Sequence, residues 1–214
     1  MNRFKTISTI FVVVSIALGL FVFPLLPEQT PIHWNAQGEI DGYGPPWIGA
    51  LLFPAIMVFM LLLLIVVPKI AVFKENLKAF EKQYWQLGVV LELFFLIFFI
   101  VSLLPSFGIT ANFFVSFTIP FGFLFLAIGY LMPSFKRNFF VGIKTPWSLA
   151  NDTVWEKTHS LGGTLFMLAG IIAIVSSLAP AQAFWIAIAA IIVATVIPLV
   201  YSFLLYQKIR ERQL

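Results

Sequence analysis

Long apolar runs alternate with short polar segments along the whole chain. An α-helix needs about 20 apolar residues to cross the roughly 30 Å hydrocarbon core of a bilayer. Six runs meet or approach this length: Ile7–Leu26, Trp47–Val67, Leu87–Leu104, Phe113–Met132, Leu161–Leu178 and Ala183–Tyr206. Pro, Gly or charged residues bound each run. The pattern therefore predicts an all-α integral membrane protein with six transmembrane helices.

The first run has two interpretations. Arg3 and Lys5 give it a basic start, which a signal peptide also has. Its apolar part is longer than the apolar region of a signal peptide, and the following FVFPLLPEQ offers no small-residue cleavage site. We therefore expect a retained transmembrane helix.

Composition supports the membrane assignment. Of the 214 residues, 61% are hydrophobic and only 10% are charged, whereas a soluble domain has about 25% charged residues. No soluble core of this length hides so much apolar surface. The chain has no cysteine, which excludes disulfides, thiolate nucleophiles and cysteine metal sites.

The charges divide between the two sides of the predicted bundle. With the N-terminus inside, every Lys and Arg falls in a cytoplasmic segment: Arg3, Lys5, Lys69, Lys74, Lys78, Lys82, Lys136, Arg137, Lys144, Lys157, Lys208, Arg210 and Arg212. The outer segments carry only Glu28, Glu39 and Asp41. The positive-inside rule then places both termini in the cytoplasm. The net charge of +4 follows this topology, so it does not indicate direct nucleic-acid binding.

An amphipathic segment lies between the second and third runs. Apolar residues recur there at helical spacing, namely Ile70, Phe73, Leu77, Phe80 and Tyr84. The pattern predicts an amphipathic cytoplasmic helix. Such a helix commonly lies at the membrane interface as a connector, and the alternative is a docking surface for a cytoplasmic partner.

The outer segment 27–46 contains the polar sequence PIHWNAQGEIDGYG, which is rich in turn formers. A compact turn explains these residues without a ligand, and a binding surface is the alternative. The binding candidates are His33, Trp34, Asn35, Gly38, Asp41 and Tyr43. The spacing of His33, Glu39 and Asp41 matches no zinc motif, and no nucleophile pattern surrounds them. We predict no enzyme, no metal and no cofactor.

The inner segment 133–160 has signals for helix starts. Thr145 before Pro146 fits an N-cap followed by proline at the first helical position. Thr153 and Glu156 fit a capping box that opens the fifth helix. This helix would carry Trp155 and His159 on one face. The glycines that follow, at 162 and 163, would allow close approach by another helix.

Glu92 lies about one turn inside the cytoplasmic end of the third run. An ionisable group within a membrane is costly and marks a candidate functional site. One interpretation is a role in transport, as part of a small-solute or lipid-linked transporter. The other is contact with the headgroups or with a lysine of the inner face.

The inner segment resembles the SdpI family of bacterial membrane immunity proteins. The residues that carry the resemblance are Asn138, Gly142, Ile143, Lys144, Thr145, Pro146, Trp147, Trp155, His159 and Gly162. Lys144 stands where arginine is commoner in the family. The outer segment is similar to a small N-terminal domain often fused to SdpI modules, through Ile32, His33, Asn35, Gly38 and 41–44. The resemblance implies an N-terminal module over 1–70 and an SdpI-like module over 71–214.

The resemblance also implies a function. Its characterised members reside in the bacterial cytoplasmic membrane and protect the producing cell against a secreted antimicrobial peptide. They relay the presence of that peptide by holding a small transcriptional repressor at the membrane. The expected partners are thus the lipid bilayer, a peptide toxin outside and a repressor inside. A transporter that uses Glu92 and a structural membrane protein without a ligand are the alternatives.

Overall fold

The computed structural model describes residues 3–35, 38–109 and 113–212. Its elements are α1 (Arg3–Val22), η1 (Phe23–Leu25), β1 (Thr30–Trp34), β2 (Ile40–Gly44), α2 (Pro46–Ile70), α3 (Lys74–Ala79), α4 (Glu81–Leu103), η2 (Leu104–Phe107), α5 (Phe113–Leu131), η3 (Met132–Ser134), α6 (Pro146–Ala150), α7 (Asp152–Ser176) and α8 (Ala183–Glu211). Within these ranges, six helices are long and apolar enough to cross a membrane. The predicted six-span architecture is confirmed.

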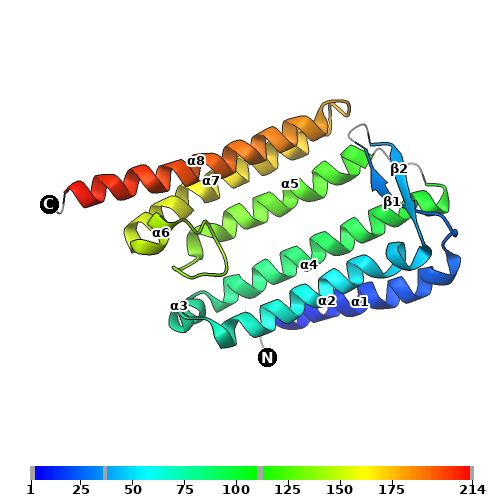
Figure 1. Ribbon diagram of the computed structural model, residues 1–214, viewed down its shortest axis with the longest axis horizontal. Coiled ribbons are helices and arrows are strands. Elements are labelled where there is room, and N and C mark those ends of the chain that lie inside the picture. Colours follow the sequence, from blue (N-terminus) through cyan, green and yellow to red (C-terminus); the bar gives the residue numbers. More distant parts are fainter. Residues whose placement is uncertain (1–2, 36–37, 110–112, 213–214) are drawn as a thin grey trace.

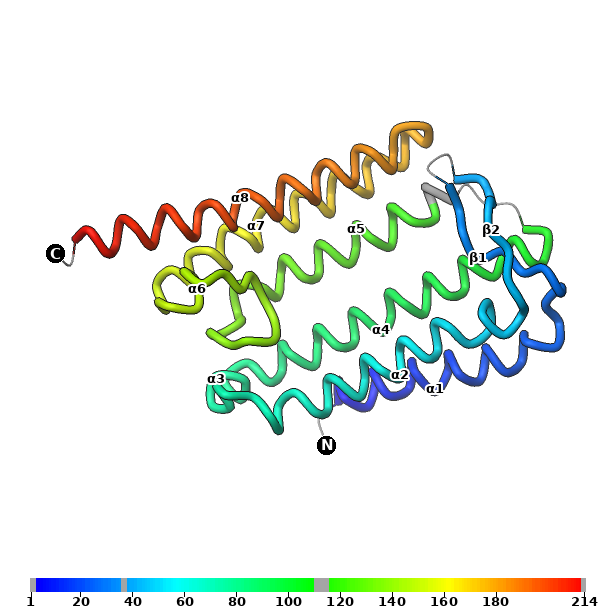
Figure 2. Tube along the Cα trace, viewed as in Figure 1, coloured from blue at the N-terminus to red at the C-terminus, as the bar shows by residue number. Residues whose placement is uncertain are grey.

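The spans form two groups of three helices (Figures 1 and 2). Helices α1, α2 and α4 pack together, as do α5, α7 and α8, and the groups meet mainly where α4 contacts α5. The division into an N-terminal module over 1–70 and an SdpI-like module over 71–214 remains a prediction from the resemblance. In the structure, α4 belongs to the second of these ranges but packs with α1 and α2.

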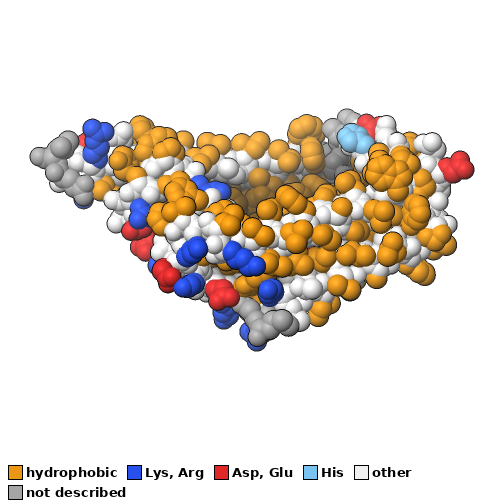
Figure 3. Space-filling model, turned by 60° about the horizontal axis from the view of Figure 1, so that its bottom comes forward, with side chains coloured by type: hydrophobic (Ala, Val, Ile, Leu, Met, Phe, Trp, Pro, Cys, Tyr) orange, Lys and Arg blue, Asp and Glu red, His pale blue; other side chains and the backbone are white. Residues whose placement is uncertain are grey.

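Lysine and arginine gather at one end of the bundle, together with α3, α6 and the two ends of the chain (Figures 1 and 3). We call this the basic end, and we call the opposite end the hairpin end because β1 and β2 lie there. Figure 3 shows hydrophobic side chains over most of the surface between the two ends, as a lipid solvent requires. That the basic end faces the cytoplasm remains a prediction from the charge distribution.

A glycine and a proline bring α1 against α2. Pro54 has no N–H, so it cannot bond the Ala50 carbonyl one turn earlier in α2. Gly19 of α1 lies against that carbonyl, and a Cβ at Gly19 would collide with the Ala50 oxygen. The absent side chain therefore lets α1 approach a carbonyl that lacks its usual helical donor.

Two glycine pairs bring α5 against α7. Gly122 faces Gly170, and one heptad away Gly129 faces Gly163. A Cβ on any of these residues would lie 2.6–2.7 Å from the carbonyl oxygen of its partner. The backbones therefore touch with no side chain between them, as small residues allow in membrane helices. The prediction that Gly163 permits close approach by a neighbouring helix is confirmed.

The hydroxyl of a tyrosine replaces the hydrogen-bond donor that a second proline of α2 lacks. Pro68 cannot donate to the Leu64 carbonyl within α2. The hydroxyl of Tyr84 in α4 donates to that carbonyl instead, at 3.1 Å. Tyr84 is 2% exposed, so this bond joins α2 to α4 inside the protein, close to the basic end.

Several helices begin before the apolar run that predicted them. Helix α1 starts at Arg3 rather than Ile7 and α4 at Glu81 rather than Leu87, while α7 starts at Asp152, close to the predicted cap at Thr153 and ahead of the apolar run at Leu161. Their first turns are polar, so hydrophobicity alone misses them. The start of α7 also corrects the predicted capping box at Thr153. The N-cap is Asn151, whose side chain accepts from the N–H of Val154 at 3.1 Å.

The predicted amphipathic helix is interrupted. Only Lys74–Ala79 forms α3, and the chain breaks again at Phe80 before α4 begins. Leu77, Phe80 and Tyr84 are buried as the stripe predicted, whereas Ile70 is 63% exposed. The apolar periodicity found the buried positions but could not show the turn between the two helices.

Candidate functional site

The outer segment forms an antiparallel hairpin with a compact turn. Asn35 shapes the turn: its Oδ1 accepts from the N–H of Glu39 at 3.0 Å, and its Nδ2 donates to the Glu39 carboxylate at 3.1 Å. Gly38 adopts φ of 81°, which favours glycine. The predicted compact turn is thus present as part of a hairpin, although residues 36 and 37 at its tip lie outside the described ranges.

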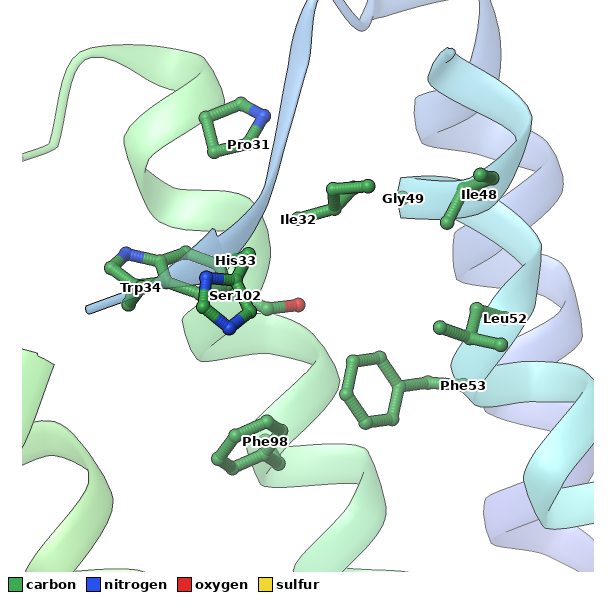
Figure 4. A pocket seen from close by; sticks show the side chains of 10 residues that line it. All are labelled: Pro31, Ile32, His33, Trp34, Ile48, Gly49, Leu52, Phe53, Phe98 and Ser102. Carbon is green, nitrogen blue, oxygen red and sulfur yellow. The ribbon is translucent and has the colours of Figure 1, made fainter. Parts of the chain in front are cut away.

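A pocket of about 250 Å³ lies beneath the hairpin (Figure 4). Its walls come from three elements: Pro31, Ile32, His33 and Trp34 on β1, Ile48, Gly49, Leu52 and Phe53 on α2, and Phe98 and Ser102 on α4. The rings of Phe53 and Phe98 meet edge to face, with centroids 5.3 Å apart. We call this cavity the hairpin pocket. It is an apolar space at the hairpin end with an imidazole and an indole at its side.

Only part of the predicted outer candidate set lines the hairpin pocket. His33 and Trp34 do, whereas Asn35 and Gly38 build the turn. Tyr43 is 54% exposed and lies opposite Pro31 on the second strand, outside the lining.

His33 is paired with Asp41 across the hairpin. Nδ1 of His33 lies 2.5 Å from Oδ1 of Asp41, and both side chains are largely exposed. Gly42 lies opposite His33, and a Cβ there would be 2.7 Å from the His33 Cβ. Among the described residues, no group of three His, Cys, Asp or Glu side chains is arranged to hold a metal ion.

At the basic end, His159 fixes the inner segment. Its Nδ1 lies 2.8 Å from the carbonyl of Trp155, and its Nε2 accepts from the N–H of Ile143 at 3.0 Å. Its ring stacks on Trp155 with centroids 4.0 Å apart, which confirms that the two lie on one face of the helix. The indole of Trp155 in turn donates to the Phe135 carbonyl at 2.6 Å. Both aromatic side chains are buried, so they hold the loop backbone rather than meet a partner.

Asn138 holds the same loop from within. Its Oδ1 accepts from the N–H groups of Phe140 and Val141, both at 2.8 Å. Its Nδ2 donates to the carbonyls of Lys136 and Val141 at 2.7 and 3.1 Å. Asn138 is 1% exposed and uses its full hydrogen-bonding capacity on the backbone.

The end of the loop is capped as the sequence predicted. Thr145 is the N-cap of α6 and Pro146 follows at the first helical position. Its hydroxyl also lies 2.9 Å from the hydroxyl of Ser202 in α8, which ties the loop to the last span. Trp147 packs edge to face on Phe203 of α8 at 4.9 Å. These contacts anchor the end of the loop to α8.

Of the predicted inner candidates, Lys144 and Pro146 are exposed and Trp147 is half-buried. The amine of Lys144 donates to the carbonyls of Phe139 and Phe140 at 3.2 and 3.0 Å. A lysine point charge suits two convergent carbonyls, and no bidentate group is needed there. Gly142 is half-buried as well, whereas Asn138, Thr145, Trp155 and His159 are buried.

Arg137 is an inner residue that the sequence did not single out. Its Nη1 donates to the Leu149 carbonyl at 3.0 Å, and its Nε lies 2.9 Å from the Asp152 carboxylate. Its guanidinium lies over the ring of Phe73, and its carbonyl accepts from Asn76 at 2.7 Å. Arg137 thereby joins the inner loop to the segment before α4, a contact that no local sequence pattern reveals.

Glu92 lies inside the packed bundle. It is 11 residues beyond the start of α4, about three helical turns. It is 0% exposed, and neither carboxylate oxygen has a hydrogen-bond partner in the described part of the chain. The predicted contact with headgroups or with an inner-face lysine is therefore wrong. Ser8 of α1, which is also buried and has no partner among the described residues, lies near Gly88 on the same face of α4.

Known protein families match both the N-terminal and the C-terminal part of the chain. The model of the SdpI/YfhL protein family matches residues 134–202, and that of a domain of unknown function (DUF1648) matches residues 10–58. The chain is 24% identical to Immunity protein SdpI of Bacillus subtilis (strain 168) over 207 residues, which cover 95% of this chain and 96% of that protein. These two matches and the similarity over nearly the whole chain support the resemblance to the SdpI family. No solved structure matches it.

The similarity to SdpI agrees with the six apolar helices, and together they support a multi-pass protein of the bacterial cell membrane. The SdpI/YfhL match ends at Ser202, the residue that bonds the cap of α6. The DUF1648 match contains the β1 and α2 walls of the hairpin pocket but not its α4 wall. SdpI is not a known enzyme family, and none of these matches is to a transporter, so the transport alternative is not favoured.

Sequence reasoning missed the α2 and α4 walls of the hairpin pocket. Phe53 and Phe98 each stand in a long apolar run, where nothing separates a pocket residue from a lipid-facing one. Ser202, in contrast, could have been singled out from the sequence. A hydroxyl within an apolar span needs a hydrogen-bond partner, which points to contact with another helix or loop.

Proposed function

We propose that this SdpI-family protein protects its cell against a secreted antimicrobial peptide, and that the hairpin pocket receives an apolar side chain of that peptide. The observation that carries the proposal is the pocket itself, which combines an apolar interior with a position at the hairpin end. Its volume of about 250 Å³ is below the roughly 300–1,000 Å³ of small-molecule sites. A single aromatic or branched side chain fits this space better than a whole small ligand.

Charge around the hairpin favours a cationic peptide. Between residues 6 and 68 the only charged side chains are Glu28, Glu39 and Asp41, apart from any charge on His33. An acidic surface attracts a basic peptide over distance and disfavours acidic ones. Trp34 beside the pocket supports the proposal, because large aromatic side chains dominate the energetics of many binding surfaces. Immunity protein SdpI, the similar protein of Bacillus subtilis, supports the immunity role through its name.

We propose in addition that the basic end relays the peptide's presence by holding a small cytoplasmic repressor at the membrane. The support is the resemblance of the inner segment and the exposure of Lys144 and Pro146 on a loop held by buried contacts. A rigid loop presents the same surface to a partner without an ordering cost. Exposed lysines at this end, such as Lys136 and Lys157, suit an acidic partner surface.

A survival assay tests the immunity role. A sensitive bacterium expressing this protein is exposed to a panel of purified secreted antimicrobial peptides, with an empty vector as the control. We expect survival against at least one cationic peptide. A parallel affinity capture on the detergent-solubilised protein is expected to retain a small DNA-binding protein from the host. Protection against no peptide, together with no captured repressor, would refute the proposed function.

A further inference from the structure

A second cavity, of about 340 Å³, opens at the basic end between four helices. It lies where α1, α2, α3 and the start of α4 converge. Its polar lining is Lys5, Lys69, Lys74, Lys78 and Glu81, and its apolar lining includes Leu77 and Trp85. We call this cavity the lysine pocket. It is separate from the inner loop and from the hairpin pocket.

The floor of the lysine pocket is fixed by the core. Leu77, Tyr84 and Trp85 line it and are 4%, 2% and 5% exposed. The bond from Tyr84 to the Leu64 carbonyl joins α4 to α2 directly at this floor. The pocket therefore keeps its shape without help from a ligand.

The rim of the lysine pocket carries unbalanced positive charge. Four lysines and one glutamate line it, which gives a net charge of +3. The amine of Lys78 also lies 2.8 Å from the Glu75 carboxylate, in an exposed ion pair. Such pairs contribute little to stability. Within the described chain, no acidic side chain lies within 4.0 Å of Lys69 or Lys74. Lys5 lies over the ring of Trp85, 5.6 Å from its centroid.

The surroundings of the lysine pocket are those of a membrane interface. Lys69 follows directly on the last apolar turn of α2, and Trp85 stands where the polar start of α4 gives way to its apolar part. Tryptophan is enriched at this depth. Ile70 and Val72, at the corner between α2 and α3, are 63% and 75% exposed. Apolar side chains this exposed beside lysines are suited to lipid rather than to water.

We propose that the lysine pocket binds the headgroup of an anionic phospholipid from the leaflet at the basic end. The phosphate takes its place among the lysine amines, and the glycerol and first acyl carbons follow the apolar wall formed by Ile65 and Pro68. Basic pockets between membrane helices on the cytoplasmic side are suited to anionic headgroups. The site would anchor the corner between α2 and α3 to the bilayer, independently of any toxin or repressor.

Native mass spectrometry of the full chain in detergent tests this proposal, with phosphatidylglycerol and phosphatidylcholine of equal chain length as probes. The pocket variant is Lys69→Gln with Lys74→Gln. The control variant is Lys82→Gln with Lys157→Gln, which removes the same charge from the same end outside the pocket. We expect phosphatidylglycerol to bind about 10-fold more weakly to the pocket variant, and within about 2-fold of wild type to the control. Lys74→Gln alone should give an intermediate loss, and circular dichroism should show equal helix content throughout.

Several results would overturn the lipid site. Equal losses in the pocket and control variants would show a diffuse surface charge instead of a site. Equal binding of phosphatidylcholine and phosphatidylglycerol would remove the role of the anionic headgroup. Displacement of the lipid by millimolar inorganic phosphate would assign the pocket to free phosphate. A pocket variant that keeps phosphatidylglycerol but loses a captured cytoplasmic protein would assign the lysines to that protein.

Discussion

The imidazole of His159 accepts a hydrogen bond from the backbone N–H of Ile143 at 3.0 Å, across 16 residues of sequence. The preceding Gly142 has φ of 108°, and a Cβ on it would overlap His159 Nε2. Loop and ring fit one another only because residue 142 has no side chain. This part of the SdpI-like motif therefore holds the inner loop against α7, and the first two predictions below depend on that contact.

Gly142→Ala should destabilise the protein markedly. The substitution imposes backbone strain and drives a methyl group into the His159 ring, and we expect a loss of at least about 2 kcal/mol in unfolding free energy. Thermal unfolding in detergent measures it. Gly108→Ala is the control, because Gly108 also has positive φ, 74°, but none of the described residues lies within 4 Å of a Cβ there. It should cost only about 1 kcal/mol. Equal losses would contradict the contact with His159.

His159→Phe should loosen the inner loop while the helices remain. A phenyl ring can keep the stack on Trp155 but leaves the N–H of Ile143 without an acceptor, at a cost of about 1–3 kcal/mol. Limited proteolysis between residues 135 and 145 and the unfolding midpoint report the change. The neighbouring Thr158→Val is a matched control, since the Thr158 hydroxyl is buried and has no partner among the described residues. It should leave cleavage unchanged and stability equal or higher.

Tyr84→Phe should cost about 1 kcal/mol by leaving the Leu64 carbonyl without the phenol donor. The cost should shrink in a Pro68→Ala background, because alanine restores the helical N–H that can reach this carbonyl. A double-mutant cycle on the unfolding free energy measures the coupling. Additive losses would show that the hydroxyl does not replace the missing helical donor.

Glu92→Met should raise the unfolding midpoint. It removes a fully buried carboxyl group without a partner in the described chain and keeps most of the side-chain volume. Relief of an unsatisfied buried group is worth about 1–3 kcal/mol, or about 2–12 °C for a chain of this size. Glu92→Gln keeps a polar group and should gain less. A lower midpoint for the methionine variant would show that the carboxyl group binds something in the membrane.

The sequence predicted the spans well, because a bilayer imposes a length and polarity that apolar runs display directly. It misplaced the start of α4, whose polar first turn lies outside the apolar run, whereas the polar cap signal at Thr153 came within two residues of the N-cap of α7, Asn151. Short sequence patterns predicted the structure correctly where they depend on neighbouring residues alone, as with the Thr145 N-cap of α6.

The sites were harder to predict because their contacts are distant in sequence. The hairpin pocket needs Phe98 from α4 beside Trp34 from β1, and the lysine pocket draws on four helices. The motif residues Asn138 and His159 looked like binding candidates, yet the structure buries both. In a chain so rich in apolar residues, only packing shows which phenylalanine lines a cavity.

The most direct test of the central claim compares two neighbouring substitutions in the survival assay, using a peptide that the wild-type protein resists. Leu52→Trp fills the hairpin pocket, whereas Leu51→Trp adds the same bulk to the adjacent position of α2, which does not line it. With equal expression and helix content, we expect Leu52→Trp to lose most protection and Leu51→Trp to protect like wild type. Full protection by Leu52→Trp would contradict the hairpin pocket as the place where the peptide binds.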